Sequence, residues 1–251
     1  MLYLCGIEMR LLRALWAVYG IALFLLMMLV SIPYLLVNLV LLPEKKAIRR
    51  SIWYLHHVFT TVFFTLIGVR IKVMGREKID RKQSYVLVGN HQTALDFIAN
   101  GYAFPGVFRF LAKQELQKIP IFGFVVKKMC LIVDRKSMAS RSQSLVALKK
   151  ELEEGVSVFI YPEGTRNKSQ EPLGHFYDGA FRLALQTRAT ILPMVILNAP
   201  NVCQPGQLDL WPGTLKIAFG DPIPTASLPD DSAGALKDQV RSAMLQLLQT
   251  P

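Results

Sequence analysis

A histidine and an aspartate five positions apart, His91 and Asp96, are the pair in this sequence best suited to proton transfer. His91 follows an apolar run, residues 84–90, that is typical of a buried strand, and strand ends are where α/β sheets gather ligands. On one regular helix the two side chains would point roughly 140° apart, so they meet only if His91 lies in a loop and Asp96 in the first helical turn. The carboxylate would then fix the imidazole tautomer, while the other ring nitrogen takes a proton from a hydroxyl group.

Two further segments place an arginine just beyond a predicted strand. Residues 161–167 (YPEGTRN) follow a strand and carry Arg166, and residues 131–135 (LIVDR) end with Arg135. A guanidinium group can form a two-pronged hydrogen bond with a phosphate group. One candidate base and two arginines at three strand ends indicate a substrate that carries both a phosphate and a hydroxyl to be deprotonated.

Short apolar runs alternate with amphipathic stretches beyond residue 70. This alternation predicts an α/β fold with a mostly parallel central sheet flanked by helices. Strands are predicted at residues 84–90, 108–112, 131–134, 156–161, 189–196 and 214–219. Helices are predicted at residues 93–104, 114–128, 138–154, 179–187 and 235–248.

The first part of the chain contains two uncharged apolar runs, residues 16–42 and 53–69. The first is longer than the roughly 20 residues that span a bilayer as a helix, and the second is near the lower limit. His56 and His57 interrupt the second run and suit the headgroup level of a membrane. A basic cluster between the runs would stay cytoplasmic by the positive-inside rule: Lys45, Lys46, Arg49 and Arg50.

These constraints predict an N-terminal pair of membrane-embedded helices in residues 1–72, followed by an α/β domain in residues 73–251. If the connector and the catalytic part are both cytoplasmic, the second run cannot cross the bilayer once. A re-entrant or monotopic pair that dips into one leaflet satisfies both conditions.

The composition agrees with a membrane-attached protein that binds negatively charged partners. Hydrophobic residues make up 52% of the chain, and the formal net charge is +11. This charge favours nucleic acid, an anionic lipid surface or a phosphorylated substrate, and no nucleic-acid-binding module is recognisable. The three cysteines have neither disulfide nor zinc-ligand spacing: Cys5, Cys130 and Cys203.

The ordered motifs resemble those of the glycerolipid acyltransferases, the family exemplified by bacterial lysophosphatidate acyltransferase. The resemblance covers roughly residues 70–200. It consists of the N-H-x4-D block at residues 90–96, the D-R block ending at residue 135, the P-E-G-T-R block at residues 161–166 and the apolar-Pro block at residues 191–195. A K-x-E-L stretch begins at Lys113.

The resemblance implies an O-acyltransferase that makes phosphatidate from 1-acyl-glycerol-3-phosphate. His91 would deprotonate the free sn-2 hydroxyl, which attacks the thioester of acyl-CoA or acyl-carrier protein, and Asp96 would orient His91. No metal and no cofactor are expected, and the implied location is the bacterial inner membrane with the catalytic domain on the cytoplasmic face. Acceptor binding is assigned by the same resemblance to Lys113, Arg135, Glu163, Gly164, Thr165 and Arg166.

One departure from the family pattern concerns the acceptor. The family often has Phe-Lys-x-Gly after the third block, whereas this chain has Phe-Tyr-Asp-Gly at residues 176–179 and lacks that cation. The alternative is therefore an O-acyltransferase for another lysophospholipid or for lyso-ornithine lipid. Two readings from other classes are a non-catalytic binder of nucleic acid or anionic lipid, and a metallohydrolase that uses His91, Asp96 and Glu163.

Overall fold

The computed structural model describes residues 2–120, 122–133 and 138–249, and its centre is a seven-stranded sheet. The spatial order is β1-β7-β6-β2-β5-β3-β4, and every neighbouring pair is parallel except β6 and β7. The strands are β1 (Val69–Met74), β2 (Val86–Gly89), β3 (Phe108–Lys113), β4 (Leu131–Val133), β5 (Ser157–Ile160), β6 (Ile191–Ile196) and β7 (Gly213–Phe219). The prediction of a mostly parallel sheet is confirmed.

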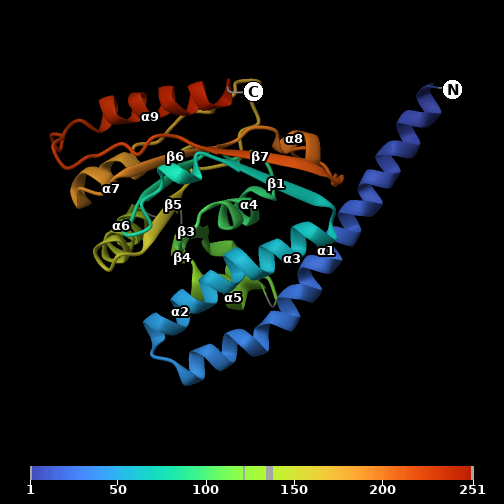
Figure 1. Ribbon diagram of the computed structural model, residues 1–251, viewed down its shortest axis with the longest axis horizontal. Coiled ribbons are helices and arrows are strands. Elements are labelled where there is room, and N and C mark those ends of the chain that lie inside the picture. The colour runs from blue at the N-terminus through green and yellow to red at the C-terminus, as the bar shows by residue number, and fades with distance from the viewer. Residues whose placement is uncertain (1, 121, 134–137, 250–251) are drawn as a thin grey trace.

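Helices cover both faces of this sheet (Figure 1). One apolar core lies between the sheet and α6 (Met138–Glu153), α7 (Gly179–Thr187) and α9 (Ala233–Leu248). The other core lies between the sheet and the N-terminal helices, together with α4 (Asp96–Ala103), α5 (Phe122–Met129) and α8 (Ala199–Val202). Val86, Leu87 and Val88 of β2 have no exposed surface. Because this strand is buried on both faces, its residues form a continuous apolar run.

The N-terminal helices form a hairpin along one side of the domain (Figure 1). The first arm is the 40-residue helix α1 (Leu2–Leu41). The returning arm consists of α2 (Glu44–Trp53), a π-helical turn η1 (Tyr54–Phe59) and α3 (Thr60–Leu66), and it leads directly into β1. Both predicted apolar runs are therefore helical, and residue 72, the predicted domain boundary, lies within β1.

Specific contacts attach α1 to the α/β domain over several turns. The Arg13 guanidinium group binds the Asp209 carboxylate with two hydrogen bonds of 2.5 and 2.7 Å. The Trp16 indole donates to the carbonyl oxygen of Ile67 at 3.1 Å. Gly20 lies so close to Leu210 that an added Cβ would be 2.6 Å from the leucine side chain. These contacts hold α1 along the domain.

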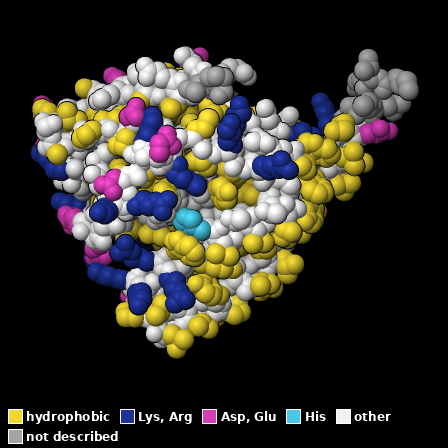
Figure 2. Space-filling view, viewed as in Figure 1, with side chains coloured by type: hydrophobic (Ala, Val, Ile, Leu, Met, Phe, Trp, Pro, Cys, Tyr) yellow, Lys and Arg dark blue, Asp and Glu magenta, His cyan; other side chains and the backbone are white. Residues whose placement is uncertain are grey.

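The outer surface of the hairpin is apolar. Exposed hydrophobic side chains follow α1 from Leu11 to Leu41 and continue at Trp53, Val58, Val62 and Leu66 on the returning arm. They form a yellow band along the lower right of Figure 2. Residues 8–41 are long and apolar enough to cross a membrane. A continuous apolar surface of this kind associates with a membrane.

Two predictions from the sequence differ from the structure, and one strand was not predicted. The predicted helix at residues 114–128 is a 3-10 turn, η3 (Gln114–Lys118), followed by α5, because Pro120 cannot donate the hydrogen bond that would continue one helix. Strand β1 was not predicted, although VRIKVM alternates apolar and polar residues. His56 is buried, with its ring centroid 4.4 Å from that of Phe108, and is not at a headgroup surface.

Gly89, the last residue of β2, offers a test of how tightly the strand preceding His91 is packed. A Cβ on Gly89 would lie 2.6 Å from the Phe159 ring. We expect Gly89→Ala to lower the free energy of unfolding by about 1–3 kcal/mol, because the fully buried ring has to shift. Thermal unfolding in detergent would measure this loss. Gly179→Ala is the control, since a Cβ there meets nothing within 4 Å; equal melting of the two variants would contradict the packing argument.

Candidate active site

The predicted contact between His91 and Asp96 is present. Nδ1 of His91 lies 2.9 Å from Oδ2 of Asp96. His91 is in the loop after β2, and Asp96 is the first residue of α4, which is the arrangement that the five-residue spacing requires. The Asp96 side chain is 1% exposed and that of His91 is 19% exposed. A proton on Nδ1 that bonds the carboxylate leaves Nε2 as a base that a substrate can reach.

Further hydrogen bonds from the loop hold the Asp96 carboxylate in place. Its Oδ2 accepts from the backbone N–H groups of Gln92 at 2.6 Å and Thr93 at 2.8 Å, and its Oδ1 accepts from the Thr93 hydroxyl at 2.7 Å. These donors fold residues 92–95 around the carboxylate before α4 begins. Asp96 therefore fixes the loop as well as the imidazole.

The Tyr161 ring forms a flat support for the His91 imidazole. The two ring centroids are 4.1 Å apart, and the ring planes differ by 18°. The Tyr161 hydroxyl accepts a hydrogen bond of 3.0 Å from Nδ2 of Asn100 on α4. Burial, together with the nearby Asp96 charge, raises the pKa of Tyr161 well above its ordinary value. The ring therefore remains neutral and acts as packing for the histidine.

Glu163 holds the backbone of His91 in place. Its Oε1 accepts from the backbone N–H of His91 at 3.0 Å, and its Oε2 accepts from the backbone N–H of Gly174 at 2.8 Å. The His91 carbonyl accepts from the backbone N–H of Asn167 at 2.7 Å. Burial raises the pKa of Glu163, although the two N–H donors oppose this shift. These hydrogen bonds thus hold the P-E-G-T-R block against the loop that contains His91.

Gly164 takes a conformation that other residues rarely adopt. Its φ of +67° is in the left-handed region, and a Cβ there would lie 3.2 Å from the Tyr177 ring. The tight turn lets the chain leave β5, direct Glu163 inward and expose Thr165 and Arg166.

Asn90 joins the ends of two neighbouring strands beside the site. Its side-chain amide donates to the Ile196 carbonyl at 3.0 Å and accepts from the Ile196 backbone N–H at 2.8 Å. The side chain is 2% exposed. Asn90 therefore ties the loop that carries His91 to β6.

We expect Glu163→Gln to lower kcat by about 10- to 100-fold with little change in KM. A glutamine can accept from only one of the two backbone N–H groups, and it turns its own NH₂ toward the other, which leaves a buried donor without an acceptor at a cost of about 1–3 kcal/mol. Steady-state kinetics of the purified variant would measure the change. Glu171→Gln, on the exposed part of the neighbouring loop, is the control, and a Glu163→Gln enzyme with unchanged kcat would contradict the positioning role.

The structure brings some of the predicted site residues together and keeps others apart. His91, Asp96, Glu163 and Gly164 form one cluster, and the Arg166 charge is close enough to affect the pKa of Tyr161. Lys113 is the last residue of β3, which lies two strands from β2 in the sheet. Lys113 is therefore roughly 10 Å from the end of β2 along the sheet edge.

The structure says less about the other residues that were predicted to bind the acceptor. Lys113 is half exposed and forms a 3.0 Å ion pair with Glu115. Thr165 is exposed. Arg135 lies outside the described residues. The assignment of these side chains to acceptor binding stays a prediction.

Several side chains support the His91–Asp96 pair without having been predicted from the sequence to do so. They are Asn90, Thr93, Asn100 and Tyr161, to which the backbone N–H of Asn167 is added. Asn90 and Tyr161 stand in the quoted motifs, so their position directly beyond buried strands was a usable signal. Asn100 gave no signal, because its role depends on how α4 packs against β5.

No metal-binding cluster was found in the part of the chain that the structure describes. There, no group of three or more His, Cys, Asp or Glu side chains could hold a metal ion. Each oxygen of the Asp96 and Glu163 carboxylates accepts a hydrogen bond. The arrangement is suited to proton transfer by an oriented imidazole.

The fold and this site define an α/β protein with a hydrogen-bonded histidine–aspartate pair at the carboxyl end of a mostly parallel sheet. The family model described as Acyltransferase matches residues 70–197, about half of the chain. The chain belongs to this acyltransferase family. The matched residues include His91, Asp96, Lys113 and the whole P-E-G-T-R block.

Relatives and a solved structure agree with this membership. The chain is 30% identical over 203 residues to 1-acyl-sn-glycerol-3-phosphate acyltransferase of Saccharomyces cerevisiae, covering 78% of this chain and 66% of the relative. It is 37% identical over 137 residues to the protein of that name from Borreliella burgdorferi, covering 54% of each. The chain thus spans between half and two thirds of the length of these relatives.

The crystal structure of the 1-acyl-sn-glycerophosphate (LPA) acyltransferase PlsC from Thermotoga maritima superposes with a TM-score of 0.76. The sequence identity is 21%, and the match covers 97% of this chain and 98% of that one. The two proteins share a fold, including its N-terminal helices.

Proposed function

We propose that this protein is a 1-acylglycerol-3-phosphate O-acyltransferase, which transfers an acyl group to the sn-2 hydroxyl of lysophosphatidate. The observation that carries the proposal is the His91–Asp96 pair, which leaves one imidazole nitrogen accessible beside a basic sheet edge. The names of the relatives from yeast and Borreliella supply the substrate class.

In the proposed reaction, Nε2 of His91 removes the proton from the sn-2 hydroxyl as the oxygen attacks the thioester carbonyl of the donor. The Asp96 carboxylate stabilises the imidazolium that forms. When the tetrahedral intermediate collapses, the carbon–sulfur bond breaks and the imidazolium returns its proton to the sulfur. The products are phosphatidate and the free thiol of CoA or of the acyl-carrier protein.

The acceptor phosphate is proposed to bind the cations along the same sheet edge. Arg166 is exposed directly after the turn at Gly164, and Lys113 ends a strand of the same sheet. Arg135 follows β4 in the sequence. Because Lys113 and Arg166 come at or after the carboxyl end of a strand, one acceptor with its phosphate displaced along the edge can contact both the base and these cations.

We expect Arg166→Ala to raise KM for lysophosphatidate by roughly 10-fold or more while kcat falls much less. A charge-assisted hydrogen bond to phosphate contributes about 1.5–3 kcal/mol, and it is present before and during the reaction. Initial rates at varied acceptor concentration would separate the two constants. Arg182→Ala, an exposed arginine on α7, is the control. A fall in kcat at constant KM would place Arg166 in the chemical step instead.

The hairpin is proposed to dip into the cytoplasmic leaflet of the inner membrane without crossing it. At 1.5 Å per residue α1 is about 60 Å long, twice the roughly 30 Å of a bilayer core, yet its contacts at Arg13, Trp16 and Gly20 keep it along the domain. This arrangement would hold the active site near lipid acceptors while soluble donors approach from the water.

A different lysolipid acceptor is the second candidate, and the Tyr177 contact favours it. The Tyr177 ring packs over Gly164. The family often has a lysine at the position of Tyr177, directly after the phenylalanine. The Asp178 carboxylate forms a 2.9 Å ion pair with the Lys237 ammonium group. A tyrosine in place of a cation weakens the electrostatic preference for a phosphate monoester.

Competition between acceptors tests the proposal against this alternative. The purified full chain would receive labelled acyl-CoA, or labelled acyl-carrier protein, with equimolar lysophosphatidate, other lysophospholipids and lyso-ornithine lipid. Label mainly in phosphatidate supports the proposal. Label mainly in another lipid would favour the second candidate, and hydrolysis without transfer would contradict both.

A further inference from the structure

A second basic site lies at the end of the sheet opposite His91. A cleft of about 710 Å³ is formed where the chain enters β2, β3 and β5, and its walls include Gln83, Val107 and Gly155. Gln83 precedes β2 and His91 follows it, eight positions later in the sequence, which places them on the order of 20 Å apart at opposite ends of the strand. The cleft is therefore separate from the catalytic site.

Positive charge dominates this cleft. Its lining contains five basic side chains and no acidic one: Lys45, Lys46, Arg49, Arg50 and Arg81. Lys45 forms an exposed 2.9 Å ion pair with Glu154, and the other four form no ion pair with the residues that the structure describes. Like charges gathered around one hollow repel each other, and an anion bound between them would relieve this repulsion.

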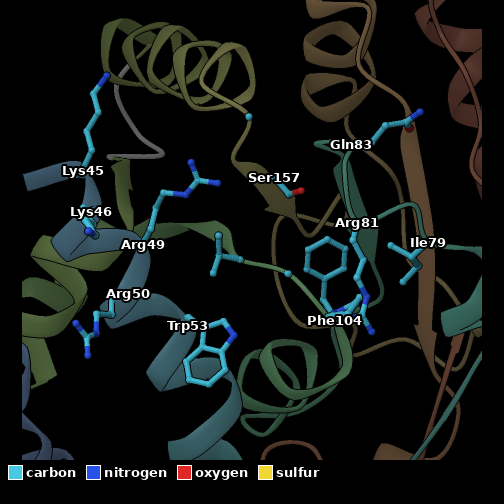
Figure 3. A pocket seen from close by; sticks show the side chains of 14 residues that line it. Lys45, Lys46, Arg49, Arg50, Trp53, Ile79, Arg81, Gln83, Phe104 and Ser157 are labelled. Carbon is cyan, nitrogen blue, oxygen red and sulfur yellow. The ribbon is translucent and has the colours of Figure 1, made fainter.

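Two different walls of the cleft each contribute an arginine. In Figure 3, Arg49 extends from α2 on one wall and Arg81 lies on the other, with Phe104 and Ser157 between them. One guanidinium group can form two parallel hydrogen bonds with a phosphate group, so the arginines of the two walls provide two such binding groups for an anionic ligand in the cleft. Both arginines are exposed and free to close on a ligand.

The cleft also lies beside the membrane-binding surface. Helix α2 begins two residues after α1, whose last turn has Val40 and Leu41 exposed by 80% and 73%. Trp53, at the end of α2, lines the cleft and is 49% exposed, as expected of an aromatic residue at a membrane interface. Figure 2 shows Lys and Arg side chains at the lower left, over α2, next to the apolar band.

We propose that this cleft is a second phosphate-binding site, which holds the phosphate of an anionic phospholipid headgroup from the surrounding membrane. Arg49 and Arg81 bind the phosphate, and Trp53 packs against the lipid at the rim. The bound lipid fixes α2, and with it the hairpin, at the depth that keeps the active site at the membrane surface. The site requires membrane association but not acyl transfer, so its test is independent of the proposed function.

Trp53 provides a direct readout of binding. The full chain in neutral detergent would be titrated with a water-soluble, short-chain phosphatidate while tryptophan fluorescence is followed. The chain has three tryptophans, and of these only Trp53 lines the cleft. We expect a saturable change that Trp53→Phe removes and His91→Ala keeps. A change that persists in Trp53→Phe would overturn the assignment.

A charge-matched pair of variants tests the role of the arginines. Arg49→Gln combined with Arg81→Gln should weaken binding to vesicles of phosphatidylcholine with 20% phosphatidate by roughly 10- to 30-fold, since each basic residue near an anionic surface contributes a factor of about five. Lys149→Gln combined with Lys150→Gln removes the same charge from α6 and should change binding less than threefold. Equal loss in both pairs would show general electrostatic attraction and overturn the site.

The remaining outcomes distinguish the source of the phosphate. Inorganic phosphate at millimolar concentration should displace the short-chain lipid only weakly, because it lacks the apolar contact with Trp53. Displacement by inorganic phosphate at equal concentration would identify a site for free phosphate and overturn the lipid assignment. Displacement only by an acidic acyl-carrier protein would identify a protein-docking surface and would also overturn it.

Discussion

His91→Ala is expected to lower kcat at least 1,000-fold while the protein remains folded. General-base catalysis contributes roughly 100- to 10,000-fold, and no other described titratable side chain is held by Asp96 at this sheet edge. The side chain is partly exposed, so its removal opens little buried space. Acyl transfer by the purified variant, with its melting temperature measured in parallel, would test this expectation.

A second histidine variant controls for the loss of an imidazole as such. His57 lies in the hairpin, with its Nδ1 3.0 Å from the Trp53 carbonyl. His57→Ala should keep acyl transfer within about twofold in detergent. A His91→Ala enzyme that retained more than a tenth of the wild-type kcat would refute His91 as the general base.

Asp96→Asn is expected to lower kcat by roughly 100- to 10,000-fold with little change in stability. An amide oxygen at the position of Oδ2 can still accept from His91, Gln92 and Thr93, and the amide NH₂ can donate to the Thr93 hydroxyl, which rotates to accept it. The hydrogen bonds are thus kept, but the charge that stabilises the imidazolium is lost. Stopped-assay kinetics and thermal melting of the same preparation would separate these effects.

Asp96→Ala serves as the structural comparison. It removes both the charge and the acceptor for three loop donors, so it should lower the melting temperature as well as kcat. If Asp96→Asn melted as early as Asp96→Ala, the loss of activity could not be assigned to charge, and the electrostatic role of Asp96 would be contradicted.

The sequence predicted the sheet and the dyad well because both depend on local patterns. Continuous apolar runs identify buried parallel strands, and the strand ends carried His91, Tyr161 and Lys113. The five-residue spacing of His91 and Asp96 limited the geometry to a loop followed by a helix start, which is what the structure has.

The contacts around the dyad could not be predicted, because they join segments that are distant in sequence. Glu163 is 72 residues from His91, and its carboxylate bonds two backbone N–H groups that have no sequence signature. The pairing of β1 with β7 could not be predicted for the same reason, because these strands are also distant in the sequence. The basic cluster of α2 was visible in the sequence, but its convergence with Arg81 on one cleft depends on the tertiary fold.

The most direct test of the proposed function is the product formed by the purified full chain from labelled acyl-CoA and lysophosphatidate. Our account predicts labelled phosphatidate, with the new acyl group at the sn-2 position, in amounts that depend on both substrates. It also predicts loss of this product in His91→Ala and its retention in His57→Ala. Release of free fatty acid without phosphatidate, or equal phosphatidate formation by His91→Ala, would contradict the account.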